Sequence, residues 1–117
     1  SLKEIYSKME DISENKNLLV ECKQSNSESE IIDFIQHAHN EFDGIIINAG
    51  GYTHTSVSIR DALKYFDGYI IEIHMSNIHA REEFRKISMI SGVSDGLIVG
   101  FGPDSYYLAL KAIISKI

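Results

Sequence analysis

Three short apolar runs constrain what this chain can fold into more than any other feature. They are the isoleucines that follow Gly44, the segment Tyr69–His74 and residues 97–101. Their hydrophobic residues are nearly continuous rather than alternating, which indicates strands that are covered on both faces. Because such strands occur in parallel sheets that lie between two layers of helices, the runs predict an α/β fold.

Segments with the apolar spacing of amphipathic helices separate these strands. Apolar residues recur every three or four positions over residues 2–12, 31–38 and 59–66, which predicts three helices. A short charged helix is expected over residues 78–86. Pro103 suits the first position of a closing helix, because the N–H that proline lacks would have no partner there.

A further strand is predicted over residues 17–23, NLLVECK, and Ser27 and Glu30 then form a capping box that begins the second helix. Since helix and strand alternate with short connections, we expect one domain over residues 1–117 with a doubly wound, flavodoxin-like parallel sheet. In the common strand order 2-1-3-4-5, a first strand absent from these residues would lie between residues 17–23 and the strand after Gly44.

Composition limits the partners that this domain can have. The 117 residues carry a formal net charge of −6 and no basic patch, which argues against binding to nucleic acid. The single cysteine, Cys22, cannot form an intrachain disulfide, and we interpret it as a buried structural thiol in a reducing cytoplasm. The apolar runs are too short for a membrane span or a signal peptide, so we expect a soluble cytoplasmic protein.

Polar side chains end the predicted strands, at the edge where open α/β sheets bind their ligands. Asn48 ends one strand, and a loop with two adjacent glycines leads from it to His54. Glu72 and His74 are two residues apart on a strand and project from one face, so the carboxylate can orient the imidazole as a general acid. A satisfied core histidine is the alternative, but Glu72 would then also need a buried partner.

Two neighbouring features favour an anionic or polyhydroxylated substrate at this edge. Ser76 and Asn77 stand at an expected helix start, where backbone N–H groups can bind an anion. Arg81 and Arg85 are four residues apart, so a helix would place both guanidinium groups on one face. A surface ladder of salt bridges with the adjacent glutamates is the alternative for the arginines.

Weaker patterns are set aside. The sequence GFGPDS imitates a dinucleotide fingerprint, but no acidic partner follows it after another strand. The five histidines fit no familiar zinc spacing, which argues against a metal site. Tyr6 lies on the apolar stripe of the first helix, where packing explains it, and we do not interpret it as a catalytic base.

Four blocks of sequence, in this order and spacing, resemble the type II 3-dehydroquinate dehydratases over nearly the whole chain. They are QSNSESEIID, INAGGYTHTS with RDAL after it, EIHMSNIHAREEFR and GLIVGFGPDSYYLAL. The resemblance implies a hydro-lyase that eliminates water from 3-dehydroquinate through an enolate to give 3-dehydroshikimate. It further implies a role in the shikimate pathway of aromatic amino acid biosynthesis or in quinate breakdown, no metal or organic cofactor, and trimers that assemble into a dodecamer.

The same resemblance implies an acid and a carboxylate-binding site. His74 would protonate the departing hydroxyl in an anti elimination, with Glu72 orienting its ring. Met75 and Ser76 would offer backbone N–H groups to the carboxylate of the substrate.

Roles in holding the substrate ring are implied for five further residues. Asn48, His54 and Arg85 would hold the ring hydroxyls and position the acid. Arg81 would support the pocket, and Asp61 would reach the active site of a neighbouring subunit in the trimer.

Three features of the family have no counterpart in residues 1–117. Its members begin with a strand ending in a PNLN-like motif, followed by a mobile lid with an essential arginine and by the tyrosine that abstracts the proton. We therefore retain a second hypothesis, a non-catalytic homologue that binds a cyclic hydroxy acid or acts only as an assembly subunit. A third, a flavodoxin-like receiver or nucleotide-binding module, is open only formally. The intact Glu72, His74 and Arg85 favour the enzyme.

Overall fold

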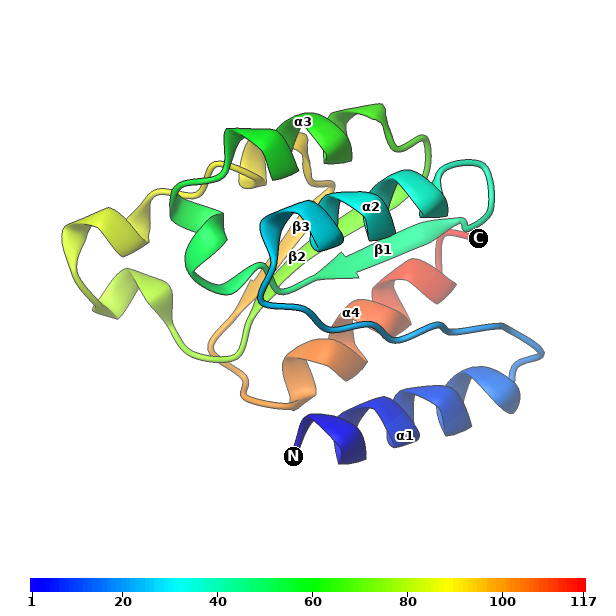
Figure 1. Ribbon diagram of the computed structural model, residues 1–117. Helices are drawn as coiled ribbons and strands as arrows, with labels where there is room; N and C mark the ends of the chain where they lie inside the picture. The colour runs from blue at the N-terminus through cyan, green and yellow to red at the C-terminus, as the bar shows by residue number, and fades with distance from the viewer.

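The computed structural model describes residues 1–117 as a parallel sheet between two layers of helices (Figure 1). The strands are β1 (Gly44–Ile47), β2 (Tyr69–His74) and β3 (Gly96–Val99), in the order β1-β2-β3. Both strand pairs are parallel, and β2 is the central strand. The predicted α/β fold is confirmed. β3 ends two residues earlier than predicted, because Gly100 adopts a φ of +92°.

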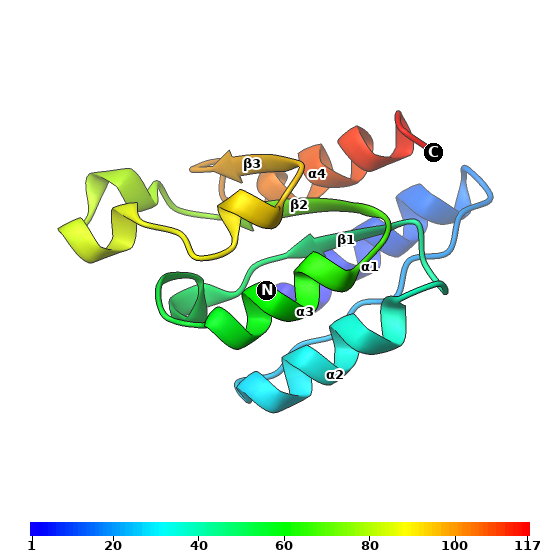
Figure 2. The same cartoon turned by 90° about the horizontal axis from the view of Figure 1, so that it is seen from above.

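Four α-helices cover the two faces of the sheet (Figures 1 and 2). One face carries α1 (Leu2–Glu14) and α4 (Asp104–Ile114), and the other carries α2 (Glu28–Ala38) and α3 (Val57–Tyr65). Their apolar stripes agree with the predicted helices. None of the helices combines the length and the apolar character that crossing a membrane would require.

Each layer of helices has its own hydrophobic core against the sheet. Alternate side chains of β2 enter the two cores, with Ile70 on the α2–α3 face and Ile71 and Ile73 on the α1–α4 face. Burial of side chains of this size stabilises the fold by about 1.5–3 kcal/mol each. The continuous hydrophobicity of the strands therefore has the predicted cause.

The predicted strand over residues 17–23 is wrong. These residues are extended, and side chains are alternately half-buried and exposed from Leu18 to Lys23. However, the main chain between Leu19 and Asn26 makes no hydrogen bond to any other main-chain group. A strand needs a hydrogen-bonded neighbour, and none lies beside this segment.

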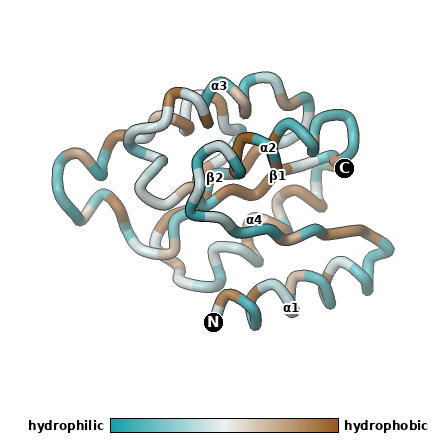
Figure 3. The backbone as a smooth tube through the Cα atoms, in the orientation of Figure 1, coloured by the Kyte–Doolittle hydropathy of each residue, from teal (hydrophilic) through white to brown (hydrophobic).

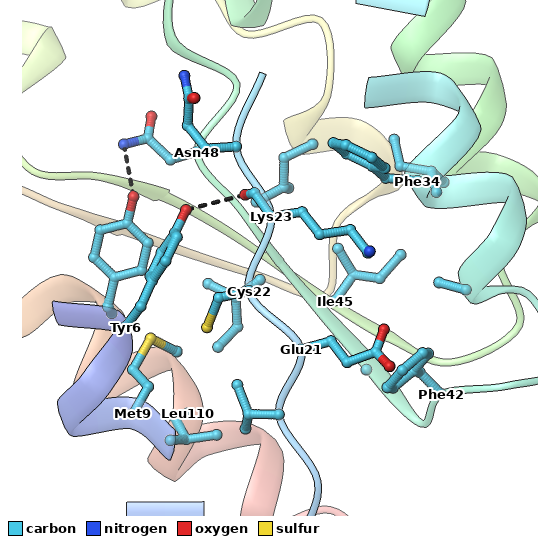
Figure 4. A pocket seen from close by; sticks show the side chains of 18 of the residues that line it. Tyr6, Met9, Glu21, Cys22, Lys23, Phe34, Phe42, Ile45, Asn48 and Leu110 are labelled. Atoms are coloured by element: carbon cyan, nitrogen blue, oxygen red, sulfur yellow. Dashed lines mark hydrogen bonds between the residues drawn. The ribbon is translucent and has the colours of Figure 1, made fainter. Parts of the chain in front are cut away.

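An apolar cavity of about 670 Å³ separates this extended segment from β1. Side chains from four elements line it, including Met9, Phe34, Ile45 and Leu110 (Figure 4). Hydrophobic residues occur both in β1 and at the start of the facing segment (Figure 3). The first strand expected between them stays a prediction. Cys22 faces this cavity and is half-buried, not fully buried as interpreted from sequence.

The predicted helix over residues 78–86 is also wrong. Two short 3₁₀ turns, Ile78–Ala80 and Glu83–Lys86, replace it, and Arg81 between them is extended with a ψ of −159°. Nine residues, five of them charged, are too few to form a stable helix without an apolar face packed on the protein. Arg81 and Arg85 are consequently not one helical turn apart.

Candidate active site

The carboxyl ends of the three strands lie at one end of the sheet, where the loops that follow β1 and β2 also gather (Figure 2). Asn48 directly follows β1, and β2 ends with Glu72 and His74. The Oδ1 atom of Asn48 accepts from Gly50 N at 3.2 Å, and its Nδ2 donates to Tyr106 Oη at 3.3 Å (Figure 4). This exposed amide therefore borders both the strand ends and the cavity beside β1.

Glu72 and His74 form the buried ion-pairing group of this edge. Nε2 of His74 donates to Oε2 of Glu72 at 2.6 Å, and the two residues are 5% and 0% exposed. The pairing expected from their spacing is thus present. The only buried side-chain nitrogen or oxygen without a partner is Oγ1 of Thr53. Nδ1 of His74 also has no hydrogen-bond partner, but it is not among the buried atoms. It therefore reaches solvent and is the ring nitrogen open to a ligand.

Glu72 is held as a carboxylate inside the protein. Burial alone raises its pKa, but hydrogen bonds from His74, Ser91 and Ser88 together with the charge of His74 outweigh burial. The pKa of Glu72 therefore lies below its ordinary value. An ionised Glu72 accepts Nε2–H of His74 and so orients the imidazole, as a general acid requires.

The two serines that bond Glu72 come from the loop that connects the second 3₁₀ turn to β3. Ser88 Oγ donates to Oε2 of Glu72 at 2.9 Å, and Ser91 Oγ donates to Oε1. Sequence analysis missed both residues. They lie 16 and 19 positions from Glu72, and no periodicity relates a loop serine to a strand at that separation.

His54 is brought to His74 by the loop after β1. Its Nδ1 donates to the carbonyl oxygen of Ile87 at 2.7 Å, and the two imidazole rings stack with centroids 6.5 Å apart at 19°. The edge of the His54 ring also meets Phe84 at 6.1 Å. The Nε2 atom of His54 is thus left without a protein partner, in a ring that stacks on His74.

Other residues expected at the site lie at its margin. Met75 and Ser76 follow His74 in an exposed loop, and Met75 O accepts from Gly102 N at 2.8 Å. Nε of Arg85 donates to Glu82 at 2.7 Å, and its guanidinium lies 4.9 Å from the ring centroid of Phe84.

Two predicted site residues are not brought together with the pair. Arg81 is exposed and forms no ion pair. Asp61 is exposed on α3, and its nearest cation is Arg60 at 3.8 Å. The surface ladder considered for the arginines is present in part, as Arg85–Glu82 and Lys86–Glu83.

Tyr6 is a packing residue of the cavity wall. Its hydroxyl donates to the carbonyl oxygen of Lys23 at 3.0 Å (Figure 4). Burial, followed by the neighbouring Tyr106 and Cys22, raises the pKa of Tyr6 to about 12. Tyr6 packs against the core under α1 and α4, as its place on the apolar stripe predicted. No group of three or more His, Cys, Asp or Glu side chains is placed to hold a metal ion.

Residues 1–114 match the family described as Dehydroquinase class II. The chain belongs to the class II dehydroquinase family. Two relatives, each named 3-dehydroquinate dehydratase, come from Nitratiruptor sp. and Campylobacter jejuni and are 50% identical to this chain. The similarity covers 96% and 97% of this chain and 72% and 71% of those proteins.

A solved dehydroquinase has the same fold. The type II dehydroquinase of Butyrivibrio crossotus superposes with a TM-score of 0.92 at 45% identity, covering 96% of this chain and 79% of that one. The resemblance inferred from the four sequence blocks is therefore confirmed, and the Glu72–His74 pair lies within the matched residues.

Proposed function

We propose that this class II dehydroquinase is a 3-dehydroquinate dehydratase in which residues 1–117 supply the general acid. It is a hydro-lyase of the type named for its relatives, which are half identical to it. The observation that carries the proposed role of the site is the buried Glu72–His74 pair with Nδ1 of His74 open to solvent. A buried carboxylate and imidazole in this arrangement suit proton donation to a leaving hydroxyl.

In the proposed elimination, a base removes a proton from the carbon beside the substrate ketone and an enolate forms. Collapse of the enolate expels the hydroxyl on the other face of the ring. Nδ1 of His74 donates a proton to that oxygen, so water leaves and His74 becomes neutral. Glu72 fixes the orientation of the donor ring through Nε2.

Substrate binding is proposed for the exposed residues around the pair. Backbone N–H groups of Met75 and Ser76 bind the substrate carboxylate, while Asn48, His54 and Arg85 hold the ring hydroxyls. The stacking of His54 on His74 and the position of Asn48 beside the same strand end support this assignment.

Two further residues are assigned to the surroundings of this pocket. Arg81 supports the pocket as an uncompensated cation, and Asp61 contributes to the site of a neighbouring subunit. The exposure of Asp61 on α3, away from the pair in its own chain, supports the second assignment. The strand, the lid arginine and the tyrosine base implied by the family resemblance lie outside residues 1–117 and stay a prediction.

A cytoplasmic homo-oligomer, built of trimers in a dodecamer, is the proposed state of the enzyme. Large exposed apolar side chains support association, because isolated domains seldom leave so many uncovered. They include Phe84, Ile87, Leu97 and Phe101. The lone Cys22 supports a reducing compartment.

The test follows formation of the conjugated enone product by ultraviolet absorbance after addition of 3-dehydroquinate. His74→Ala is expected to lose on the order of 10²–10⁴-fold in kcat, because general acid catalysis contributes that much. His79→Ala is the matched control and should keep the activity of the wild type. His79 is exposed, and its backbone N–H bonds only to Asn77 within the same turn. A folded wild type with no activity would favour the non-catalytic homologue.

A further inference from the structure

The loop over residues 87–91 bonds to His54 and to Glu72, the partner of His74. On one side, Ile87 O accepts from His54 Nδ1 at 2.7 Å, and Met89 N donates to Thr53 O at 2.7 Å. On the other side, its two serines reach Glu72, the partner of His74. One short segment therefore connects the loop after β1 to the end of β2.

The two serine hydroxyls complete the coordination of the Glu72 carboxylate. Oε2 accepts from both His74 Nε2 and Ser88 Oγ, whereas Oε1 accepts from Ser91 Oγ. Glu72 is fully buried, so water cannot replace a lost donor without opening the site. Without Ser91, Oε1 would have no side-chain partner.

The arrangement also determines which nitrogen of each ring can face a ligand. Nε2 of His74 is occupied, because it donates to the carboxylate that the two serines hold. Nδ1 is therefore the nitrogen of His74 that remains for the ligand. The carbonyl oxygen of Ile87 selects the opposite tautomer for His54, with the proton on Nδ1 and Nε2 free. The two stacked rings thus leave different nitrogens without a protein partner.

We propose that Ser88 and Ser91 are positioning residues that hold the Glu72 carboxylate in the orientation in which it receives Nε2–H of His74. This inference rests on the proposed function for its catalytic consequence, but the orientation of Glu72 can be measured without turnover. Ser91 gives the cleaner test, because its hydroxyl donates only to Glu72. The Ser88 hydroxyl also accepts from the backbone of Ile90 and Ser91 and so supports the turn.

The first experiment is an NMR titration of the Glu72 carboxyl and the His74 ring nitrogens in the wild type, Ser91→Ala and Ser94→Ala. Loss of one hydrogen bond to a charged group should raise the apparent pKa of the Glu72 carboxyl by about one pH unit in Ser91→Ala. It should also reduce the fraction of neutral His74 that carries its proton on Nε2. Ser94 is the matched control, since it lies in the same region but donates to Ile90 O, and its variant should titrate as the wild type does.

Rescue separates positioning from packing. Ser91→Thr restores a hydroxyl and should return the titration to that of the wild type. If Ser91→Ala does not fold, Ser91→Cys keeps the side-chain volume with a weaker donor and should give an intermediate shift. The proposal would be overturned if Ser91→Ala titrated as Ser94→Ala does; where Ser91→Cys replaces Ser91→Ala, the same comparison applies. A shift that Ser91→Thr does not reverse would also overturn it.

The kinetic experiment tests the catalytic consequence. In an active enzyme, Ser91→Ala should lower kcat on the order of tenfold with little change in KM, because only part of the general acid contribution is lost. The acidic limb of its profile of kcat against pH should move to higher pH, since the form with ionised Glu72 is the active one. Inactivity of every protein, including the wild type, would contradict the proposed function, whereas the titration alone decides the positioning of Glu72.

Discussion

β1 and β2 are neighbouring strands with similar apolar sequences, yet their surroundings differ. β2 pairs with β1 on one edge and with β3 on the other, and five of its six residues are buried. β1 pairs only with β2, and three of its four residues are partly exposed. A continuous hydrophobic sequence therefore specifies a strand but does not supply both of its neighbours.

The Glu72–His74 pair and the extended segment differ in the same way as the two strands beside which they lie. The Glu72–His74 pair lies at the end of the central strand, where both carboxylate oxygens of Glu72 accept a hydrogen bond. The extended segment across the cavity from β1 has unpaired main-chain groups from Leu19 to Asn26. The Glu72–His74 pair therefore lies on the most completely paired strand, and the loosely held part of the fold lies beside β1.

The largest expected difference is in the free energy of unfolding of core variants. Ile73→Ala should destabilise the protein by about 2–5 kcal/mol, because Ile73 is 0% exposed on the central strand. Leu19→Ala on the extended segment should stay within about 0.5 kcal/mol, because Leu19 is 74% exposed. Urea titrations followed by circular dichroism measure both. A large loss of stability in Leu19→Ala would mean that this segment is packed against something.

A smaller difference should appear in the dependence of stability on pH. The pKa of Glu72 is lowered in the folded protein, so between its folded and unfolded values the unfolded state binds more protons. Its contribution to stability is present above the unfolded pKa, about 4.3, and is lost as pH falls through the lower folded pKa. Comparison of urea titrations of the wild type and Glu72→Gln over this range isolates the contribution. Parallel stability curves for the two proteins would contradict it.

The smallest free energies concern local opening of the extended segment. Amides of residues 19–26 should exchange with solvent at nearly the rate of an unfolded chain, with an opening free energy of about 0 kcal/mol. Those of Ile71 and Ile73 should exchange only when the whole domain unfolds. Hydrogen exchange followed by NMR compares the two directly. Equal protection would show that residues 19–26 are hydrogen-bonded in solution and would remove the contrast between the two regions.

Much of the site could be predicted from local sequence. Residues two apart on a strand share a face, so Glu72 and His74 were expected to pair, and they do. The same reasoning located Asn48 at the neighbouring strand end. The prediction that Arg81 and Arg85 lie on one helical face was wrong, because the charged segment does not form a helix. Their spacing had meaning only within that helix.

Local sequence specifies the period of each element, and therefore which side chains share a face. It predicted the three strands, the four α-helices and the proximity of Glu72 to His74, since all depend on neighbours within a few residues. Two features became visible only in the folded chain. Residues 17–23 have no paired neighbour, and Ser88 and Ser91 donate hydrogen bonds to Glu72. Strand pairing and contacts from a loop depend on segments far apart in sequence, and local periodicity carries no information about those distances.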